Sequence, residues 1–321
     1  MKIKILMSLT AAMLLSMIHS SCKRGPAEEP EFDKTSAFTY VRKQVEFGPR
    51  VPNSEAHKNC AAWMIGEFKS HGARVIAQEF QPTAFDGTVL QGTNIIASHN
   101  QSAKHRIILA AHWDSRPFSD QDPDSAFHKT PVDGADDGAS GVGVLMEISR
   151  NLQQSPLKKL GVDIILFDCE DYGNDGGEME SWCLGSQHWS KNFHEPGYRA
   201  DYGVLLDMVG GKDPNFSQEY YSRQLAPRVM DKVWGIAKEM GYGHWFVNTA
   251  GAPIIDDHIF VNKDARIPMI NIINRPPGSK TGFVHHWHTQ KDDLNAIEPA
   301  TLEAVGKVLI RLIYLEDADK I

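Results

Sequence analysis

The most regular feature of the sequence is a series of short apolar runs, each followed by acidic, histidine or Pro-Gly positions. The runs are RIILAA before His112, VDIILFD before Glu170, YGVLL before Asp207 and IPMINII before the loop at 276–278. Patterns of helical period lie between and after them, at about 139–153, 185–192, 224–240 and 300–315. Short apolar runs that alternate with amphipathic helices are typical of a largely parallel β-sheet covered by helices on both faces.

The segment before these runs has its own start and stop signals. SEAHKNCAAWMIGEFKSHG offers Ser54 as an N-cap and Gly72 as a stop, with apolar residues on one face, which predicts a helix. RVIAQEF and VLQGTNIIAS then predict two neighbouring strands. Because no internal repeat and no linker follows residue 35, the sequence predicts one α/β domain over residues 36–321.

The first residues predict export. A short positive region precedes an apolar run at 5–18, which is shorter than the roughly 20 residues of a membrane-spanning helix, so residues 1–21 are typical of a secretory signal. Cys22 follows small residues, as in a bacterial lipoprotein processing site, although His19 replaces the usual apolar residue. We expect residues 22–35 to be a flexible tether and Cys22 to carry a lipid that anchors an exported, periplasmic protein to a membrane. Plain secretion is the alternative.

Composition narrows the possible partners. The net charge is -8, with acids and bases mixed along the chain. Because no basic run with interleaved aromatic residues is present, we expect no nucleic-acid partner. Beyond Cys22 the sequence has Cys60, Cys169 and Cys183, an odd number that permits at most one disulfide. One hypothesis pairs Cys169 with Cys183, and the other leaves three buried free thiols.

Residues with chemical potential gather where the apolar runs end. Because ligands bind at the carboxyl ends of the strands in such sheets, we expect His112, Glu170 with Asp171, and Asp207 at one edge. Asp168 is expected to have a structural role at its strand end. Further candidates come from ADDG, DDH and HHWH, and they are Asp136, Asp137, Asp256, Asp257, His258, His285, His286 and His288.

Taken singly, each candidate has a simpler explanation. A lone Asp in a glycine-rich turn is usually a turn residue or a helix cap, and a lone His is usually a hydrogen-bonded surface or core residue. Their conjunction is harder to explain in that way. Carboxylates and imidazoles at several strand ends form the oxygen and nitrogen ligand set that zinc accepts. The sequence therefore indicates a zinc site with room for a substrate atom.

The order of these motifs resembles that of the zinc aminopeptidase and glutaminyl cyclase superfamily. The shared stretches are HWDS, GADDGASGV, FDCED, GSQHW, LLDMVG, DDHIF and WHT. The resemblance covers roughly residues 36–315. It implies a single-domain α/β/α sandwich around a mixed, mostly parallel sheet.

The resemblance also implies a role for each candidate. Glu170 matches the general acid/base glutamate. The position of Asp171 usually holds Glu, and because Asp is one methylene shorter, the metal or the loop must shift slightly. The implied ligands of a zinc ion are Asp137, Asp171 and His288. The residues that match the second zinc site of the aminopeptidases are His112 and Asp207.

Two reactions of this superfamily begin at the free N-terminus of a peptide. A dizinc aminopeptidase activates water and cleaves the first peptide bond. A glutaminyl cyclase uses one zinc ion to polarise the side-chain carbonyl of an N-terminal glutamine, whose α-amine attacks it, so that pyroglutamate forms and ammonia leaves. Glu170 would take a proton from the amine and return it to the leaving nitrogen. All five ligands of a dizinc site are present, so the ligand set alone does not decide.

Two other positions favour the cyclase. Aminopeptidases commonly have Ser-Asp-His where this chain has Asp-Asp-His at 256–258, and a carboxylate at Asp256 would share the proton of Glu170 and raise its pKa. Trp287 directly precedes the ligand His, as in the cyclases. With Trp182 and Ile255, it is expected to line a small substrate pocket.

We therefore predict a glutaminyl-peptide cyclotransferase with one zinc ion, acting on the N-termini of peptides and proteins. Its predicted catalytic residues are Glu170, Asp207 and Asp256. One alternative is an aminopeptidase that binds two zinc ions. A zinc-containing binding protein without catalysis is a third possibility, and the intact Glu170 argues against it.

Overall fold

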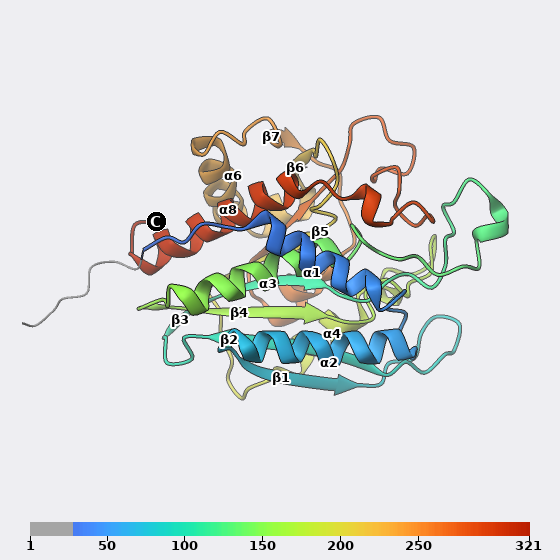
Figure 1. The fold of residues 1–321 in the computed structure, drawn as a ribbon, viewed down its shortest axis with the longest axis horizontal. Coiled ribbons are helices and arrows are strands. Elements are labelled where there is room, and N and C mark those ends of the chain that lie inside the picture. Colours follow the sequence, from blue (N-terminus) through green and yellow to red (C-terminus); the bar gives the residue numbers. More distant parts are fainter. Residues whose placement is uncertain (1–27) are drawn as a thin grey trace, which may run out of the picture.

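A computed structural model describes residues 28–321, in which helices cover a six-stranded sheet (Figure 1). The strands of this sheet are β1 (Arg74–Phe80), β2 (Gly92–His99), β3 (His105–His112), β4 (Leu160–Phe167), β5 (Tyr202–Asp207) and β8 (Met269–Ile273). Two further strands, β6 (Phe216–Gln218) and β7 (Phe246–Ala250), pair with each other in a small sheet. The predicted signal segment and Cys22 lie outside the described residues.

The described helices lie mostly where the sequence pattern predicts them. They are α1 (Lys34–Glu46), α2 (Glu55–Ser70), α3 (Ala139–Gln154), α4 (Leu184–Lys191), α5 (Tyr220–Leu225), α6 (Pro227–Glu239), α7 (Asp257–Phe260) and α8 (Pro299–Asp317). Ser54 caps α2 as predicted, because its hydroxyl accepts the N–H of His57 at 3.1 Å. The pattern does not predict α1, which buries only a narrow strip of three residues, nor the short α5 and the small sheet.

The sheet is mixed, and its parallel half carries the predicted site. The strand order is β1-β2-β4-β3-β5-β8. β3 runs parallel to β4 and β5, and β5 runs parallel to β8, whereas β2 is antiparallel to both β1 and β4. This arrangement confirms the predicted mixed sheet in an α/β fold.

Both faces of the sheet are buried, as the nearly continuous apolar runs predict. Successive side chains of a strand point to opposite faces. Leu109 and Leu206 belong to the core formed with α1, α2, α3 and α8, whereas Ile108 and Leu205 pack with Trp189 of α4 on the other face. Figure 1 shows α1, α2 and α3 in front of the sheet and α4 behind it.

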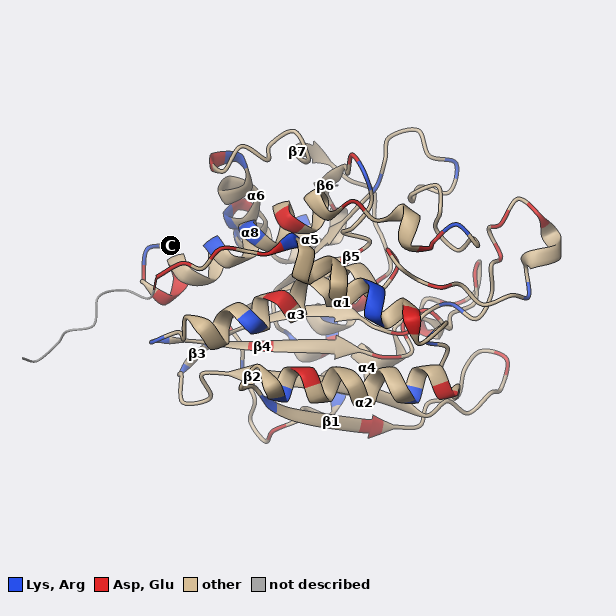
Figure 2. Cartoon of the chain, viewed as in Figure 1, with Lys and Arg blue, Asp and Glu red and all other residues tan. Residues whose placement is uncertain are grey.

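The surface charge is mixed, and the described cysteines are buried. Lys and Arg are interspersed with Asp and Glu over the helices (Figure 2). Cys60, Cys169 and Cys183 are all buried free thiols, so the hypothesis of a Cys169–Cys183 disulfide is wrong. Within residues 28–321, no helix has both the length and the apolar character needed to cross a membrane.

Helix α3 packs closely against its neighbours because two of its residues are glycines. A Cβ atom on Gly141 would lie 2.7 Å from the carbonyl oxygen of Leu206 and 2.9 Å from Cβ of Ala111. A Cβ atom on Gly143 would lie 2.6 Å from a methyl group of Val41 in α1. α3 begins two residues after Asp137. The close packing of α3 on β5 therefore also limits the position of Asp137 relative to the end of β5.

We predict opposite effects for the same substitution at two helical glycines. Gly66→Ala in α2 should raise the free energy of unfolding by about 0.5–1 kcal/mol, because nothing lies within 4 Å of the new methyl group. Gly141→Ala should lower it by about 1–3 kcal/mol, because the new methyl group overlaps backbone atoms of β5. Urea unfolding of the two variants checks both signs. A stabilised Gly141→Ala variant would contradict the close packing of α3.

Candidate active site

Three parallel strands end at one edge of the sheet, and each brings a predicted site residue there. β3 ends at His112 and β5 ends at Asp207, while Glu170 and Asp171 follow the end of β4. Asp137 arrives from the turn before α3. These residues lie far apart in the sequence, and the parallel strands place them on one side of the molecule, as predicted.

Asp137, Asp171 and His288 form the first cluster. Nε2 of His288 lies 3.1 Å from Oδ1 of Asp171 and 3.8 Å from Oδ2 of Asp137. All three side chains are buried. Ligands about 2.0–2.1 Å from one tetrahedral zinc ion lie roughly 3.3 Å apart, so this spacing suits a single ion. The shorter Asp171, where the superfamily usually has Glu, still reaches His288.

Backbone hydrogen bonds to two other buried carboxylates hold the ligand carboxylates in place. Asp292 accepts the N–H of Asp137 at 3.1 Å and the N–H of the preceding residue at 2.7 Å. Asp114 accepts the N–H groups of Glu170 and Asp171, each at 3.1 Å. Each loop is thus fixed by an acid from a different segment. The sequence interpretation does not find Asp292, because nothing local links it to Asp137.

The half-buried carboxylate of Asp120 orients His288. Its Nδ1 lies 3.3 Å from Oδ1 of Asp120, which also accepts hydrogen bonds from Arg116 at 2.6 and 3.0 Å. Burial favours the neutral acid, but the contacts with His288 and Arg116 outweigh it and hold the pKa of Asp120 well below its usual range. A carboxylate on the far nitrogen fixes the direction in which a ligand histidine points. Arg116 and Asp120 were not predicted from the motifs.

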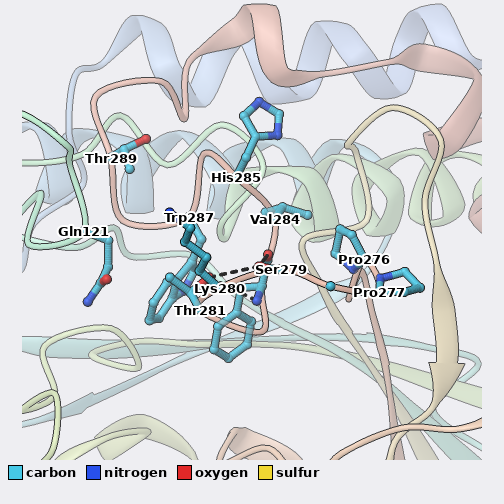
Figure 3. Close-up of a pocket in the computed structure, with 12 residues that line it drawn as sticks. Gln121, Pro276, Pro277, Ser279, Lys280, Thr281, Val284, His285, Trp287 and Thr289 are labelled. Atoms are coloured by element: carbon cyan, nitrogen blue, oxygen red, sulfur yellow. Dashed lines mark hydrogen bonds between the residues drawn. The ribbon is translucent and has the colours of Figure 1, made fainter.

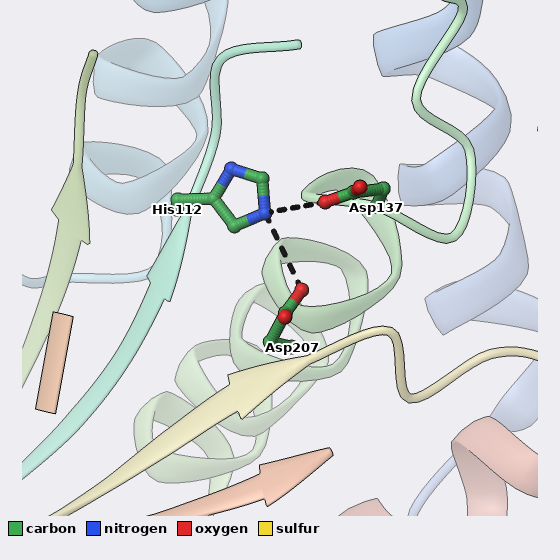
Figure 4. Close-up of side chains that lie close together, drawn as sticks. All are labelled: His112, Asp137 and Asp207. Atoms are coloured by element: carbon green, nitrogen blue, oxygen red, sulfur yellow. Dashed lines mark ion pairs between the residues drawn. The ribbon is translucent and has the colours of Figure 1, made fainter. Parts of the chain in front are cut away.

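His112, Asp137 and Asp207 form a second cluster, which shares Asp137 with the first (Figure 4). Nε2 of His112 lies 2.9 Å from Oδ1 of Asp137 and 3.4 Å from Oδ1 of Asp207. Burial raises the pKa of Asp207 to about 6, although its contact with His112 opposes the shift. Asp137 therefore turns one oxygen towards each cluster. All five residues predicted to hold one or two zinc ions meet here.

Several buried polar atoms of the two clusters lack a hydrogen-bond partner. Those that face the clusters are Nε2 of His112, Oδ2 of Asp171 and Oδ1 of Asp207. A buried polar atom without a partner costs free energy, which a bound cation would offset. Carboxylate oxygens and imidazole nitrogens are also ligands that zinc takes in catalytic sites. The residues present therefore fit a zinc site.

Glu170 belongs to a third group, with Cys183 and Asp256, in which the contributing atoms lie within 4.8 Å of one another. The thiol of Cys183 donates to Oε1 of Glu170 over 3.3 Å. Burial raises the pKa of Glu170 well above its usual range, and the charges of Asp171 and Asp256 add to the shift against the opposing charge of His112. Two neighbouring carboxyl groups of this kind can share a proton near neutral pH.

Asp256 is itself fixed by donors. It accepts the N–H of Asp257 and a side-chain N–H of Asn271, each at 2.6 Å. Burial raises the pKa of Asp256 to about 7, and the charge of Asp207 contributes to the shift. Asp256 is thus well placed to exchange a proton with Glu170 while its own position is held from the strand β8 that carries Asn271.

A cavity of about 230 Å³ joins these groups. The indole of Trp287 stacks on the imidazole of His288, with ring centroids 3.7 Å apart, and Phe283 stacks on Trp287, with ring centroids 4.4 Å apart. Trp182 and Ile255, the other predicted pocket residues, also line the cavity. Its acidic lining residues are Asp137, Glu170, Asp171, Asp175, Asp207 and Asp256.

A second cavity of about 480 Å³ adjoins the first and shares Phe283 and Trp287 with it (Figure 3). Most of its lining comes from the loop between β8 and α8, including Lys280 and His285, and Gln121 comes from another loop. The aromatic pair therefore separates a mainly acidic cavity, which Arg275 also lines, from a neighbouring space that carries Lys280.

Other sequence candidates lie outside the metal clusters. Nε2 of His258 is 3.1 Å from Oε2 of Glu219, and Nε2 of His286 is 2.8 Å from Oδ2 of Asp136. His285 is exposed. The three histidines of HHWH therefore have different surroundings, and only His288 joins a cluster.

Asp168 holds the end of β4, as expected. Its carboxylate contacts Nε2 of His57 at 2.9 Å and accepts the N–H groups of Thr93 at 2.6 Å and Cys169 at 2.7 Å. The imidazole of His57 also stacks on Trp113, with ring centroids 4.2 Å apart. The crowded acids after β4 are therefore separated by their partners: Asp168 faces α2 and β2, while Glu170 and Asp171 face the cavity.

Comparisons with known proteins agree with this geometry. The model of peptidase family M28 matches residues 94–313. A Bacteroides thetaiotaomicron glutaminyl cyclase structure is 48% identical, with a TM-score of 0.87 over 89% of this chain and 99% of that one. A structure described as a Zn-dependent exopeptidase, from Parabacteroides distasonis, is 50% identical with the same TM-score and coverage. The Drosophila melanogaster glutaminyl-peptide cyclotransferase is 27% identical over 89% of this chain and 82% of its own length.

The family match covers more than half of the chain and includes every proposed ligand. Together with the TM-score of 0.87 to a glutaminyl cyclase structure, it confirms the resemblance drawn from the motifs. The chain belongs to peptidase family M28.

Proposed function

We propose that this protein is a zinc-dependent glutaminyl-peptide cyclotransferase, which converts the N-terminal glutamine of peptides and proteins to pyroglutamate and releases ammonia. The observation that carries the proposal is the position of Glu170 beside Asp256 on a cavity of about 230 Å³ that Trp287 closes next to His288. The 48% identity to a glutaminyl cyclase over 89% of the chain supports it. The curated cyclotransferase of Drosophila supports the same reaction.

The residues of the site divide the work. Asp137, Asp171 and His288 would hold zinc, which as a Lewis acid polarises the side-chain carbonyl of the glutamine. Glu170 takes a proton from the α-amine and returns it to the departing nitrogen, and its raised pKa suits a group that both accepts and donates. The attack is intramolecular, so holding the glutamine in one orientation lowers much of the barrier.

The cavity supplies that orientation. Trp287, Trp182 and Ile255 give it apolar walls, while its acidic residues can accept hydrogen bonds from the α-amine of the substrate. The adjoining cavity of about 480 Å³ leaves room for the residues that follow the glutamine. An aminopeptidase that binds two zinc ions is the second candidate, and the cluster of His112, Asp137 and Asp207 is the observation that favours it.

The two functions give different products from one substrate. Incubation with a glutamine-initiated dipeptide should release ammonia and leave a cyclised dipeptide. Two free amino acids in place of these products would mean a peptidase, and the cyclase proposal would fail. Mass spectrometry of the products and an ammonia assay distinguish the outcomes.

We predict that one zinc ion binds tightly. His288→Ala should lose it, because two carboxylates remain without a nitrogen ligand, whereas His112→Ala should retain it. Elemental analysis of the purified proteins measures the zinc content, and circular dichroism checks that both variants fold. Two stoichiometric zinc ions in the active protein, or the loss of all zinc from His112→Ala, would contradict a site with one ion.

Replacement of the base Glu170 should leave the fold and the zinc site intact but lower turnover. Glu170→Gln keeps the shape of the side chain, so folding and zinc content should survive while turnover falls by about 10²–10⁴-fold. The KM should change little, because the pocket walls remain. Asp256→Asn should also slow turnover, and the two losses should not multiply, since the groups act on one proton. Near-normal turnover in Glu170→Gln, or loss of its zinc, would overturn the assignment within CED.

We also propose that the protein is exported and anchored in a membrane through a lipid on Cys22. The support is the sequence of residues 1–22, with a positive start, an apolar run and small residues before the cysteine. Cys22→Ser should move the protein from the membrane fraction to the soluble fraction of the expressing bacterium. Unchanged fractionation, or a mature N-terminus at another residue, would contradict the anchor.

A further inference from the structure

A buried carboxylate outside the cavity contacts the segment that carries Asp256. Glu219 is 1% exposed and precedes α5, whose first turn it caps by accepting the N–H groups of Tyr221 at 2.9 Å and Ser222 at 2.6 Å. It does not line the active-site cavity. An N-cap alone would explain these two contacts, but the same side chain makes three more.

Two of these contacts bracket Asp256. Oε1 of Glu219 accepts the backbone N–H of Ile254 at 3.1 Å, and Oε2 lies 3.1 Å from Nε2 of His258. One of these residues is two positions before Asp256 and the other is two positions after it. Ile254 also lines the cavity. Glu219 therefore holds one residue of the cavity wall and both ends of the short segment that carries Asp256.

The remaining contact leads to the carboxylate of Asp256 itself. Ser222 Oγ donates to Oε2 of Glu219 at 2.7 Å and accepts the backbone N–H of Asn271 at 2.9 Å. The side chain of Asn271 then donates to Oδ2 of Asp256 at 2.6 Å. A continuous path of close contacts therefore runs from Glu219 through Ser222 and Asn271 to the acid beside the base.

Only an ionised carboxylate satisfies these neighbours. Four donors and the imidazole of His258 converge on the two oxygens of Glu219, and an amide in its place would turn an NH₂ group towards some of the donors. Burial would raise the pKa of Glu219, but the hydrogen bond and charge of His258, together with the donors of Ser222, outweigh it and lower the pKa to about 2. Glu219 thus stays charged throughout the neutral range.

We propose that Glu219 is a positioning residue for the proton transfer: it acts through the segment 254–258 and through Ser222 to set Asp256 at its distance from Glu170. The proposal rests on the cyclase function and deepens it. It makes Glu219 part of the chemistry although the side chain touches neither substrate nor metal.

The main test is Glu219→Gln, compared with Asp33→Asn. Both substitutions change a capping carboxylate to its amide, but Asp33 caps α1 and has no described contact with the site. We expect Glu219→Gln to lower kcat by about 10- to 100-fold, since small displacements of a catalytic group cost this much. Zinc content should stay unchanged, and Asp33→Asn should keep the wild-type kcat. A normal kcat in folded Glu219→Gln would overturn the proposal.

A double-mutant cycle separates positioning from a general loss of stability. In the Asp256→Asn background, Glu219→Gln should lower kcat by less than about twofold further, because the group it positions is already disabled. If the two losses multiply, Glu219 does not act through Asp256, and the proposal fails.

Ser222→Ala provides a second, milder variant in case Glu219→Gln does not fold. It breaks the path to Asn271 while the cap of α5 and the contact with His258 remain. We expect kcat to fall several-fold with little change in KM, and again without further effect in Asp256→Asn. Unchanged kcat in Ser222→Ala would contradict the path.

Absence of ammonia release by the wild-type protein would instead reject the cyclase function. The failure of the cyclase function and the failure of the Glu219 proposal are therefore distinguishable.

Discussion

The constraint on which this structure depends is the burial of many negative charges at one edge of a sheet. The cavity is lined by the carboxyl groups of six acidic residues, and the chain supplies few cationic side chains against them. Buried carboxylates without partners would protonate or unfold the edge of the sheet. The arrangement is stable only if other groups take up the charge. A metal ion is one of these groups, and the imidazoles of His112 and His288 are the others.

Backbone amides bind a second set of buried carboxylates, which lie around the cavity. Asp114, Asp168, Asp292 and Glu219 are buried, and each accepts two or more backbone N–H groups from the segments that carry the site. These acids behave as fixed acceptors around the cavity, while Asp171 and Asp207 inside it each keep a buried oxygen without a hydrogen-bond partner. Two arginines lie close to these acids. Arg275 lines the cavity, but its guanidinium donates to the carbonyl oxygen of Gly282 and lies over the ring of Phe283. Arg116 pairs with Asp120 behind His288 and lies 3.5 Å from Asp171.

The sequence predicts the residues that line the cavity better than the residues that hold them in place. His112, Glu170, Asp171 and Asp207 could be predicted to meet because strand periodicity and parallel topology alone place them at one edge. The residues that hold them could not. Asp292 lies 155 residues from Asp137, and Glu219 lies 35 residues from Ile254, so no local pattern connects them. The ligand roles came from the motif resemblance. Sequence spacing left two hypotheses open for Cys169 and Cys183, and the one of buried free thiols is confirmed, whereas the disulfide is wrong.

The two chemistries of the family differ in the nucleophile. Both need a carboxylate and imidazole cluster at the strand ends and a glutamate beside it, so the ligands do not distinguish them. Hydrolysis would use a water molecule, whereas cyclisation uses the α-amine of the substrate itself, and in both the base moves a proton from the nucleophile to the leaving nitrogen. The surroundings of the base are therefore more informative than the ligands. Asp256, held by Asn271 and by the N–H of Asp257, places a second carboxyl group beside Glu170 where aminopeptidases commonly have serine. This difference beside the base favours cyclisation more than the metal ligands do.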